Sequence, residues 1–266
     1  MDCKNCELPL RTDYSFCANC GAKVIRNRLT LKSLWYDFTE RFFNLDNTFL
    51  KTFKHLFSRP DDVIVGYING TRKKYLNPVS YFTIALMLGG LFVYIHTEFF
   101  PDALDFKFLY PDESLATEAE KLGQDFQKKI NHYLFKYQSL VYMAMLPFLA
   151  LISRLVFINK KQFNLSEHFV INIYAYSQLS IIINIIYILL LWNSKLLYYA
   201  SVGNFIFQIC FFTWVFYKIF NLSLKQALFK LLLFLLLLAI LFVVLIVIMT
   251  VYMILFTDTF QNISGR

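Results

Sequence analysis

Four cysteines near the N-terminus have the spacing of a metal site. Cys3 and Cys6 form one CxxC pair, and Cys17 and Cys20 form a second pair after ten intervening residues. Each pair can direct two thiolates toward one ion, and ten residues suffice for a hairpin that returns the chain. The pattern predicts a tetrahedral site for structural zinc in a small ribbon spanning residues 1–28. Four protein ligands leave no open position, so such a zinc ion stabilises a fold and has no room for a substrate.

The turns around these cysteines also bear on the interpretation. Gly21 follows the second pair, where the turn often requires a positive φ, and Glu7 holds the equivalent place after the first pair. Glutamate is less suited to that conformation than glycine. Two disulfides are the alternative interpretation of the four cysteines, which a reducing cytoplasmic location would disfavour.

The chain that carries this ribbon is rich in apolar residues and poor in charge. Of its 266 residues, 58% are hydrophobic and 17% are charged, whereas soluble proteins carry about 25% charged residues. Five intervals of 17 to 27 residues contain no Asp, Glu, Lys or Arg, and about 20 apolar residues cross a membrane as a helix. We therefore predict an all-α integral membrane protein with a membrane domain over residues 79–257. Its five transmembrane helices are predicted near Val79–His96, Ser139–Ile158, Phe169–Trp192, Leu197–Phe220 and Leu231–Phe256.

The basic residues are unevenly divided between the two sides of this arrangement. The N-terminal side holds 19 of the 26 Lys and Arg residues, and cytoplasmic segments are enriched in both. The prediction is a cytoplasmic N-terminus, with residues 97–138 and the tail 258–266 outside. The net charge of +8 is then mainly a topology signal, so we expect membrane lipids as partners and no nucleic acid.

Residues 29–78 join the ribbon to the first span and are predicted to contain amphipathic interfacial helices and a juxtamembrane elbow. Aromatic and aliphatic residues recur there at spacings of three and four. This segment either lies in the headgroup plane as an interfacial helix or packs its aromatic face against the ends of the spans. Arg72, Lys73 and Lys74 precede the first span and are candidates for headgroup anchoring; Arg72 is also placed to pair with Asp61 or Asp62. The apolar stripe comprises Leu31, Leu34, Trp35, Phe38, Phe42, Phe49, Phe53, Leu56 and Phe57.

Polar residues within the spans are amides and hydroxyls rather than carboxylates or lysines. The absence of carboxylates and lysines at membrane depth weighs against proton-coupled pumps and intramembrane proteases. One interpretation is hydrogen bonding between helices, and the other is the polar lining of a transport route. The candidate lining residues are Asn172, Gln178, Asn184, Asn204 and Gln208.

One segment resembles a known family. It contains Arg59, Pro60, Val63, Ile64, Tyr67, Ile68, Gly70, Arg72, Tyr75, Asn77, Pro78 and Ser80. With the N-terminal cysteines, this pattern resembles an uncharacterised bacterial family with a zinc ribbon, a phenylalanine-rich helix and several spans. The resemblance implies a multi-pass protein of the bacterial inner membrane and no transferable activity. The five-span arrangement is also similar to that of Yip1-type proteins, as a weaker architectural likeness.

The sequence thus leads to three functional hypotheses. The first is a non-enzymatic adaptor or scaffold whose zinc ribbon docks a protein partner on the cytoplasmic side. The second is a transporter or channel for a lipid or small solute, lined by the amides listed above. The third is a membrane enzyme, which would require Glu167 and His168 to meet His55 or Asp61.

Overall fold

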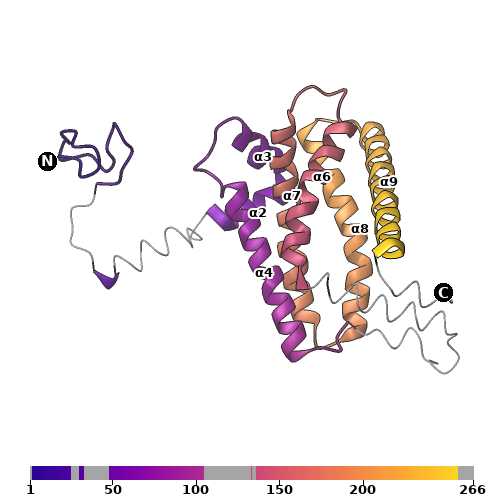
Figure 1. Ribbon diagram of the computed structural model, residues 1–266. Coiled ribbons are helices and arrows are strands. Elements are labelled where there is room, and N and C mark those ends of the chain that lie inside the picture. The colour runs from indigo at the N-terminus through magenta and orange to yellow at the C-terminus, as the bar shows by residue number, and fades with distance from the viewer. Residues whose placement is uncertain (1, 25–29, 33–47, 105–132, 134–135, 257–266) are drawn as a thin grey trace, which may run out of the picture. The chain divides into compact units, whose positions relative to one another are not determined.

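The computed structural model describes residues 2–24, 30–32, 48–104, 133 and 136–256 (Figure 1). The chain divides into two compact units, Met1–Asn47 and Thr48–Arg266. Most of the predicted outer segment 97–138, the tail 258–266 and much of the stretch between ribbon and α2 lie outside the described residues.

The described part of the first unit is built on two short turns. Isolated antiparallel bridges join Asp2 to Pro9 and Phe16 to Lys23. Its small core consists of Cys3, Leu10 and Cys17. So small a core supplies little folding stability, and a metal ion bound by both turns would supply more.

The second unit is helical. Five of its described helices are long and apolar enough to cross a membrane, which supports a multi-pass membrane protein. The two shorter helices, α2 and α3, belong to the same compact unit as these five. The described helices are α2 (Thr48–Ser58), α3 (Pro60–Ile68), α4 (Pro78–Phe99), α6 (Gln138–Val156), α7 (Leu165–Leu190), α8 (Ser194–Ile219) and α9 (Leu224–Phe256).

Capping residues decide where the long helices begin. Asn77 accepts a hydrogen bond from the Ser80 amide, and Pro78 follows it as the first residue of α4. Asn164 and Glu167 form a capping box at the start of α7, which extends the helix beyond the charge-free interval. Helices α7 and α9 begin at Leu165 and Leu224, before the predicted third and fifth spans, because those predictions started each span after the nearest titratable residue.

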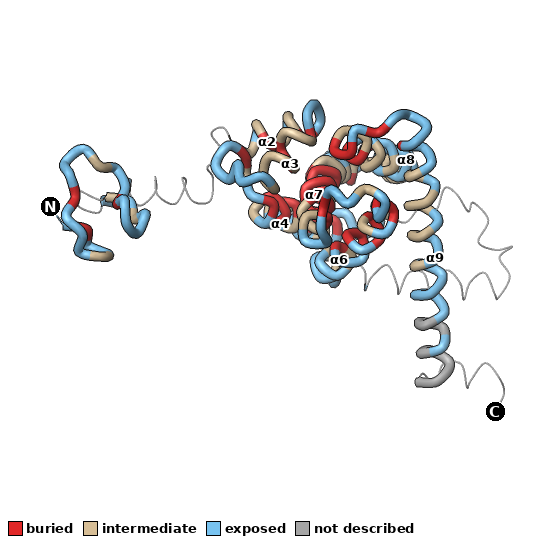
Figure 2. The backbone as a smooth tube through the Cα atoms, turned by 90° about the horizontal axis from the view of Figure 1, so that it is seen from above, coloured by how far each residue is buried: buried red, intermediate tan, exposed pale blue. Residues whose placement is uncertain are grey.

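Helix α7 lies at the centre of the second unit and α9 at its edge. In Figure 2 the buried segments cluster around α7, which contacts α4, α6 and α8. The described side chains of α9 are largely exposed and apolar, as expected for a helix that faces lipid.

Helix α2 packs its aromatic side chains on the long helices. The Phe49 ring contacts Tyr81 of α4, and the Phe57 ring contacts Phe211 of α8. Trp214 Nε1 donates a 3.0 Å hydrogen bond to the Phe57 carbonyl. For Thr48–Ser58 these contacts are those of a helix packed against the ends of the spans. Most of the preceding stripe from Leu31 to Phe42 lies outside the described residues.

Candidate functional site

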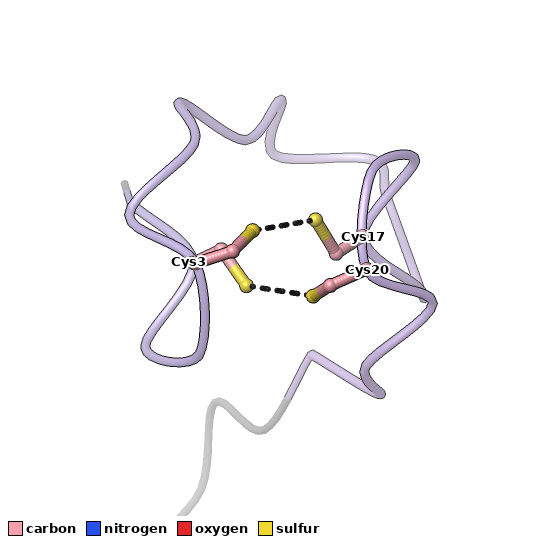
Figure 3. A group of neighbouring side chains, drawn as sticks. Cys3, Cys17 and Cys20 are labelled. Atoms are coloured by element: carbon pink, nitrogen blue, oxygen red, sulfur yellow. Dashed lines mark hydrogen bonds between the residues drawn. The ribbon is translucent and has the colours of Figure 1, made fainter.

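The four N-terminal cysteines converge on one point. Their sulfur atoms all lie within 4.8 Å of one another, and the thiols are free rather than joined in disulfides. The Sγ atoms of Cys3 and Cys20 are 3.6 Å apart, as are those of Cys6 and Cys17. Figure 3 shows thiols from the two turns facing one another across a common centre. These four residues could therefore hold a metal ion.

The two turns that present the thiols have the same backbone pattern. The amide of Glu7 bonds to the Cys3 carbonyl at 2.8 Å, and the amide of Gly21 bonds to the Cys17 carbonyl at 2.9 Å. Glu7 has a φ of 59° and Gly21 a φ of 70°, so both occupy the left-handed region. The expectation of a positive φ at Gly21 is confirmed, and Glu7 adopts the same conformation despite its side chain.

The pKa is lowered for the Cys17 and Cys20 thiols and raised for the Cys6 thiol. Hydrogen bonds from the Asn5 side chain and the Ala22 backbone lower the pKa of Cys20 to about 6. Backbone hydrogen bonds from Cys20 and Asn19 likewise lower the pKa of Cys17. At Cys6 a backbone hydrogen bond from Leu8 acts in the same sense, but burial and the neighbouring thiols raise its pKa to about 11. A cation that replaces the shared protons would allow all four sulfurs to be thiolates.

The basic cluster before α4 is held by aromatic rings. The guanidinium of Arg72 lies 4.4 Å from the centre of the Tyr67 ring, and its Nη1 donates to the Tyr67 hydroxyl at 3.2 Å. Lys74 lies 5.2 Å from the centre of the Tyr75 ring, and Lys73 is exposed. The expected ion pair of Arg72 with Asp61 or Asp62 is not among the contacts of the described residues: Arg72 contacts Tyr67, and Asp62 pairs with Arg59 at 3.4 Å.

The segment between α3 and α4 is tied to α2 and α7. Gly70 has a φ of 100°, which permits the turn after α3. The Leu76 amide donates to the Thr52 hydroxyl at 2.9 Å, and Tyr174 donates to the Leu76 carbonyl at 2.7 Å. Tyr75 is buried and its hydroxyl lies 2.8 Å from His55 Nδ1. This network fixes the angle at which the chain enters α4.

Two of the five candidate lining residues make hydrogen bonds between helices. Gln178 accepts a hydrogen bond from the Tyr81 hydroxyl of α4 and donates to the Phe53 carbonyl of α2 at 3.1 Å. Asn172 donates to Ser153 of α6 at 2.8 Å. Both amides are fully buried, so each satisfies polar groups that would otherwise face hydrocarbon.

The other three candidates meet at a cavity of about 160 Å³ between α4, α6, α7 and α8. Asn184 binds the Ser180 carbonyl at 2.7 Å, and Gln208 donates to Asn204 at 3.0 Å. Sequence reasoning missed Gln138, whose Oε1 is buried without a partner among the described residues. The sequence signal that could have identified Gln138 is its position as an amide near the start of a charge-free interval. The other lining residues are Phe92, Leu104, Tyr142, Tyr176, Leu179, Ile183 and Tyr187.

The residues named for an enzymatic site bind elsewhere. His168 is buried and its Nδ1 lies 3.0 Å from Ser153 Oγ. The Glu167 carboxylate accepts from the Asn164 amide at 2.7 Å within the α7 capping box. His55 contacts Tyr75, as described above, and Arg59. These contacts give each of the three residues a structural partner, and none of them joins Glu167 or His168 to His55.

Comparison with known proteins adds one family match. The model of a family described as "Protein of unknown function (DUF3667)" matches residues 46–89. No curated protein and no solved structure matches the chain. The matched segment covers α2, α3, the first part of α4 and the segment 69–77 between α3 and α4, here called the entry turn. The chain therefore resembles this family over the network that fixes the start of the membrane helices.

Proposed function

We propose that this protein is a membrane adaptor whose N-terminal ribbon, stabilised by zinc, docks a partner protein on the cytoplasmic side. The carrying observation is the closed set of four thiols. Zinc–sulfur bonds of about 2.3 Å in a tetrahedron place neighbouring sulfurs about 3.8 Å apart, close to the 3.6 Å separations of the two thiol pairs. A four-thiolate zinc has no open position, which favours a structural role.

The ribbon also exposes apolar side chains beside the turns. Phe16 precedes Cys17 and is 57% exposed, and Leu8 follows the first turn and is 40% exposed. Exposed apolar groups on a rigid scaffold are common anchors of protein interfaces.

The test compares partners captured by crosslinking in membranes. We expect the wild-type protein to capture a partner that is lost when Cys3 and Cys17 are replaced by Ser. The double variant Leu8→Ala, Phe16→Ala should lose the same partner while retaining the metal. The control variant Lys195→Gln should retain both the partner and the metal. Recovery of the same partner by both ribbon variants would refute the adaptor.

The cavity of Asn184, Asn204 and Gln208 supports a second candidate, a transporter or channel for a lipid or small solute. Polar groups around a space within the helices are what a route for a polar molecule requires. In a Cys210→Ala background, Asn184→Cys should react with a small impermeant thiol reagent added outside. Gln178→Cys, whose position is packed between helices, is the matched control. Equal protection of both positions would remove this candidate.

A further inference from the structure

A groove between α6 and α7 lies near the loop that joins these helices. It has a volume of about 480 Å³, and its walls are almost entirely apolar. Both helices are candidate membrane spans, so the groove opens toward lipid rather than water. The proline within α6 removes one backbone hydrogen bond there. The lining residues are Pro147, Phe148, Ala150, Leu151, Leu165, Ser166 and Phe169.

Arg154 lies one helical turn beyond the α6 residues that line this groove, on the side of the α6–α7 loop. Pro147, Ala150 and Leu151 share a face of α6 because they are three or four residues apart, and Arg154 continues that face by one more turn. Arg154 Nη1 is buried and has no hydrogen-bond partner among the described residues. A buried unpaired cationic donor is costly. The position therefore favours an anion that reaches it through the groove.

The charges around Arg154 are mostly positive. The loop after α6 adds Lys160 and Lys161, whereas residues 154–168 contain one acidic side chain, Glu167. The Glu167 carboxylate is engaged by the Asn164 amide at the start of α7. The surroundings therefore favour an anionic ligand over a zwitterionic one.

We propose that the groove binds one anionic phospholipid of the leaflet on the side of the α6–α7 loop. One acyl chain lies along the apolar wall, and the phosphate accepts a hydrogen bond from Arg154 Nη1. The pairing satisfies a donor that the described residues leave unpaired, and it places the chain where α6 and α7 leave space. This site is separate from the Arg72–Lys74 cluster and does not depend on the adaptor function.

Native mass spectrometry of the full-length protein in neutral detergent tests the site. Phosphatidylglycerol and phosphatidylcholine with identical acyl chains are added in equal amounts. We expect one phosphatidylglycerol to be retained in preference, with about tenfold weaker binding in Arg154→Gln and a smaller loss in Arg154→Lys. Leu151→Trp should also weaken retention because the indole fills the groove. Lys195→Gln, at the other end of the bundle, should bind as the wild type does.

Several outcomes would overturn the proposal. They are equal retention of the two lipids by the wild type, unchanged binding in Arg154→Gln, and full retention by Leu151→Trp. Displacement of the lipid by an equal concentration of glycerol phosphate would assign the site to a soluble anion instead. If Arg154→Gln does not fold, the comparison of Leu151→Trp with Lys195→Gln decides the question.

Discussion

The two residues that follow the cysteine pairs control how well the ribbon is arranged for a metal. Glu7 and Gly21 both have positive φ, but only glycine adopts it without steric cost. The cost for a residue with a side chain is about 1–2 kcal/mol. Because folding and metal binding are coupled in so small a unit, this cost appears in the metal affinity.

We predict that Glu7→Gly strengthens metal binding and that Gly21→Glu weakens it, each by about fivefold or more. The measurement is competition between the full-length protein and a chelator for zinc. Glu167→Gln is a control for the loss of a carboxylate elsewhere. Equal affinities in the two turn variants would mean that φ at these positions does not limit binding.

At the residue scale, the sequence predicted the metal-ligating cysteines better than the side-chain contact of Arg72. CxxC spacing is set by the local backbone, so the convergence of the four thiols followed from it. The Arg72 ion pair is not among the described contacts because a long side chain has several partners within reach, and Tyr67 is the one it contacts. Gln138 was missed because no spacing rule shows which amide will face a cavity.

At the scale of elements, α7 is held by amides that reach its neighbours. Gln178 is fully buried and connects α7 to both α4 and α2. We predict that Gln178→Leu lowers the free energy of unfolding by about 1–2 kcal/mol, because the Tyr81 hydroxyl loses its acceptor and the Phe53 carbonyl loses one hydrogen bond. Thermal unfolding in detergent measures the change.

Two further variants make that result specific. Gln208→Leu changes an exposed amide and should alter the stability by less than about 0.5 kcal/mol. Tyr81→Phe added to Gln178→Leu should recover part of the loss, because it removes the unpaired hydroxyl. A loss from Gln208→Leu as large as that from Gln178→Leu would contradict the argument.

The junction of α2 with the entry turn should respond to pH through His55. Burial, with the nearby positive charges of Arg59 and Lys51, lowers the pKa of His55 below its usual 6.5. The folded state therefore disfavours the protonated ring, so stability is present above about pH 6.5 and is lost as the pH falls below it.

Hydrogen exchange of the Leu76 amide, which bonds to Thr52, reports on this junction. We expect less protection at pH 5.5 than at pH 7.5 after correction for intrinsic exchange, and a smaller difference in His55→Gln. The same pH dependence in both proteins would assign the effect to another group.

The long helices were predictable because lipid requires apolar stretches of fixed length, and the described residues contain five such helices. Their starts were less predictable. Charge-free intervals end at a charged residue, whereas α7 begins where Asn164 and Glu167 cap it. Tertiary contacts such as that of Phe57 with Phe211 join segments far apart in the sequence, so no local pattern indicated them.

For the whole molecule, we propose a metal-bound ribbon joined to a multi-pass membrane unit, with the N-terminus inside. The uneven distribution of Lys and Arg supports that orientation, and a reducing compartment would keep the four thiols available as ligands. Chemical labelling of these four cysteines reports on both the membrane orientation of the N-terminus and the occupancy of the metal site.

The most direct test is labelling of Cys3, Cys6, Cys17 and Cys20 by an impermeant thiol reagent in cells that express the protein. We expect no labelling of these residues in intact cells, little after permeabilisation alone, and labelling of all four after permeabilisation with a zinc chelator. Labelling in intact cells would contradict the orientation, and full labelling without the chelator would contradict the metal site.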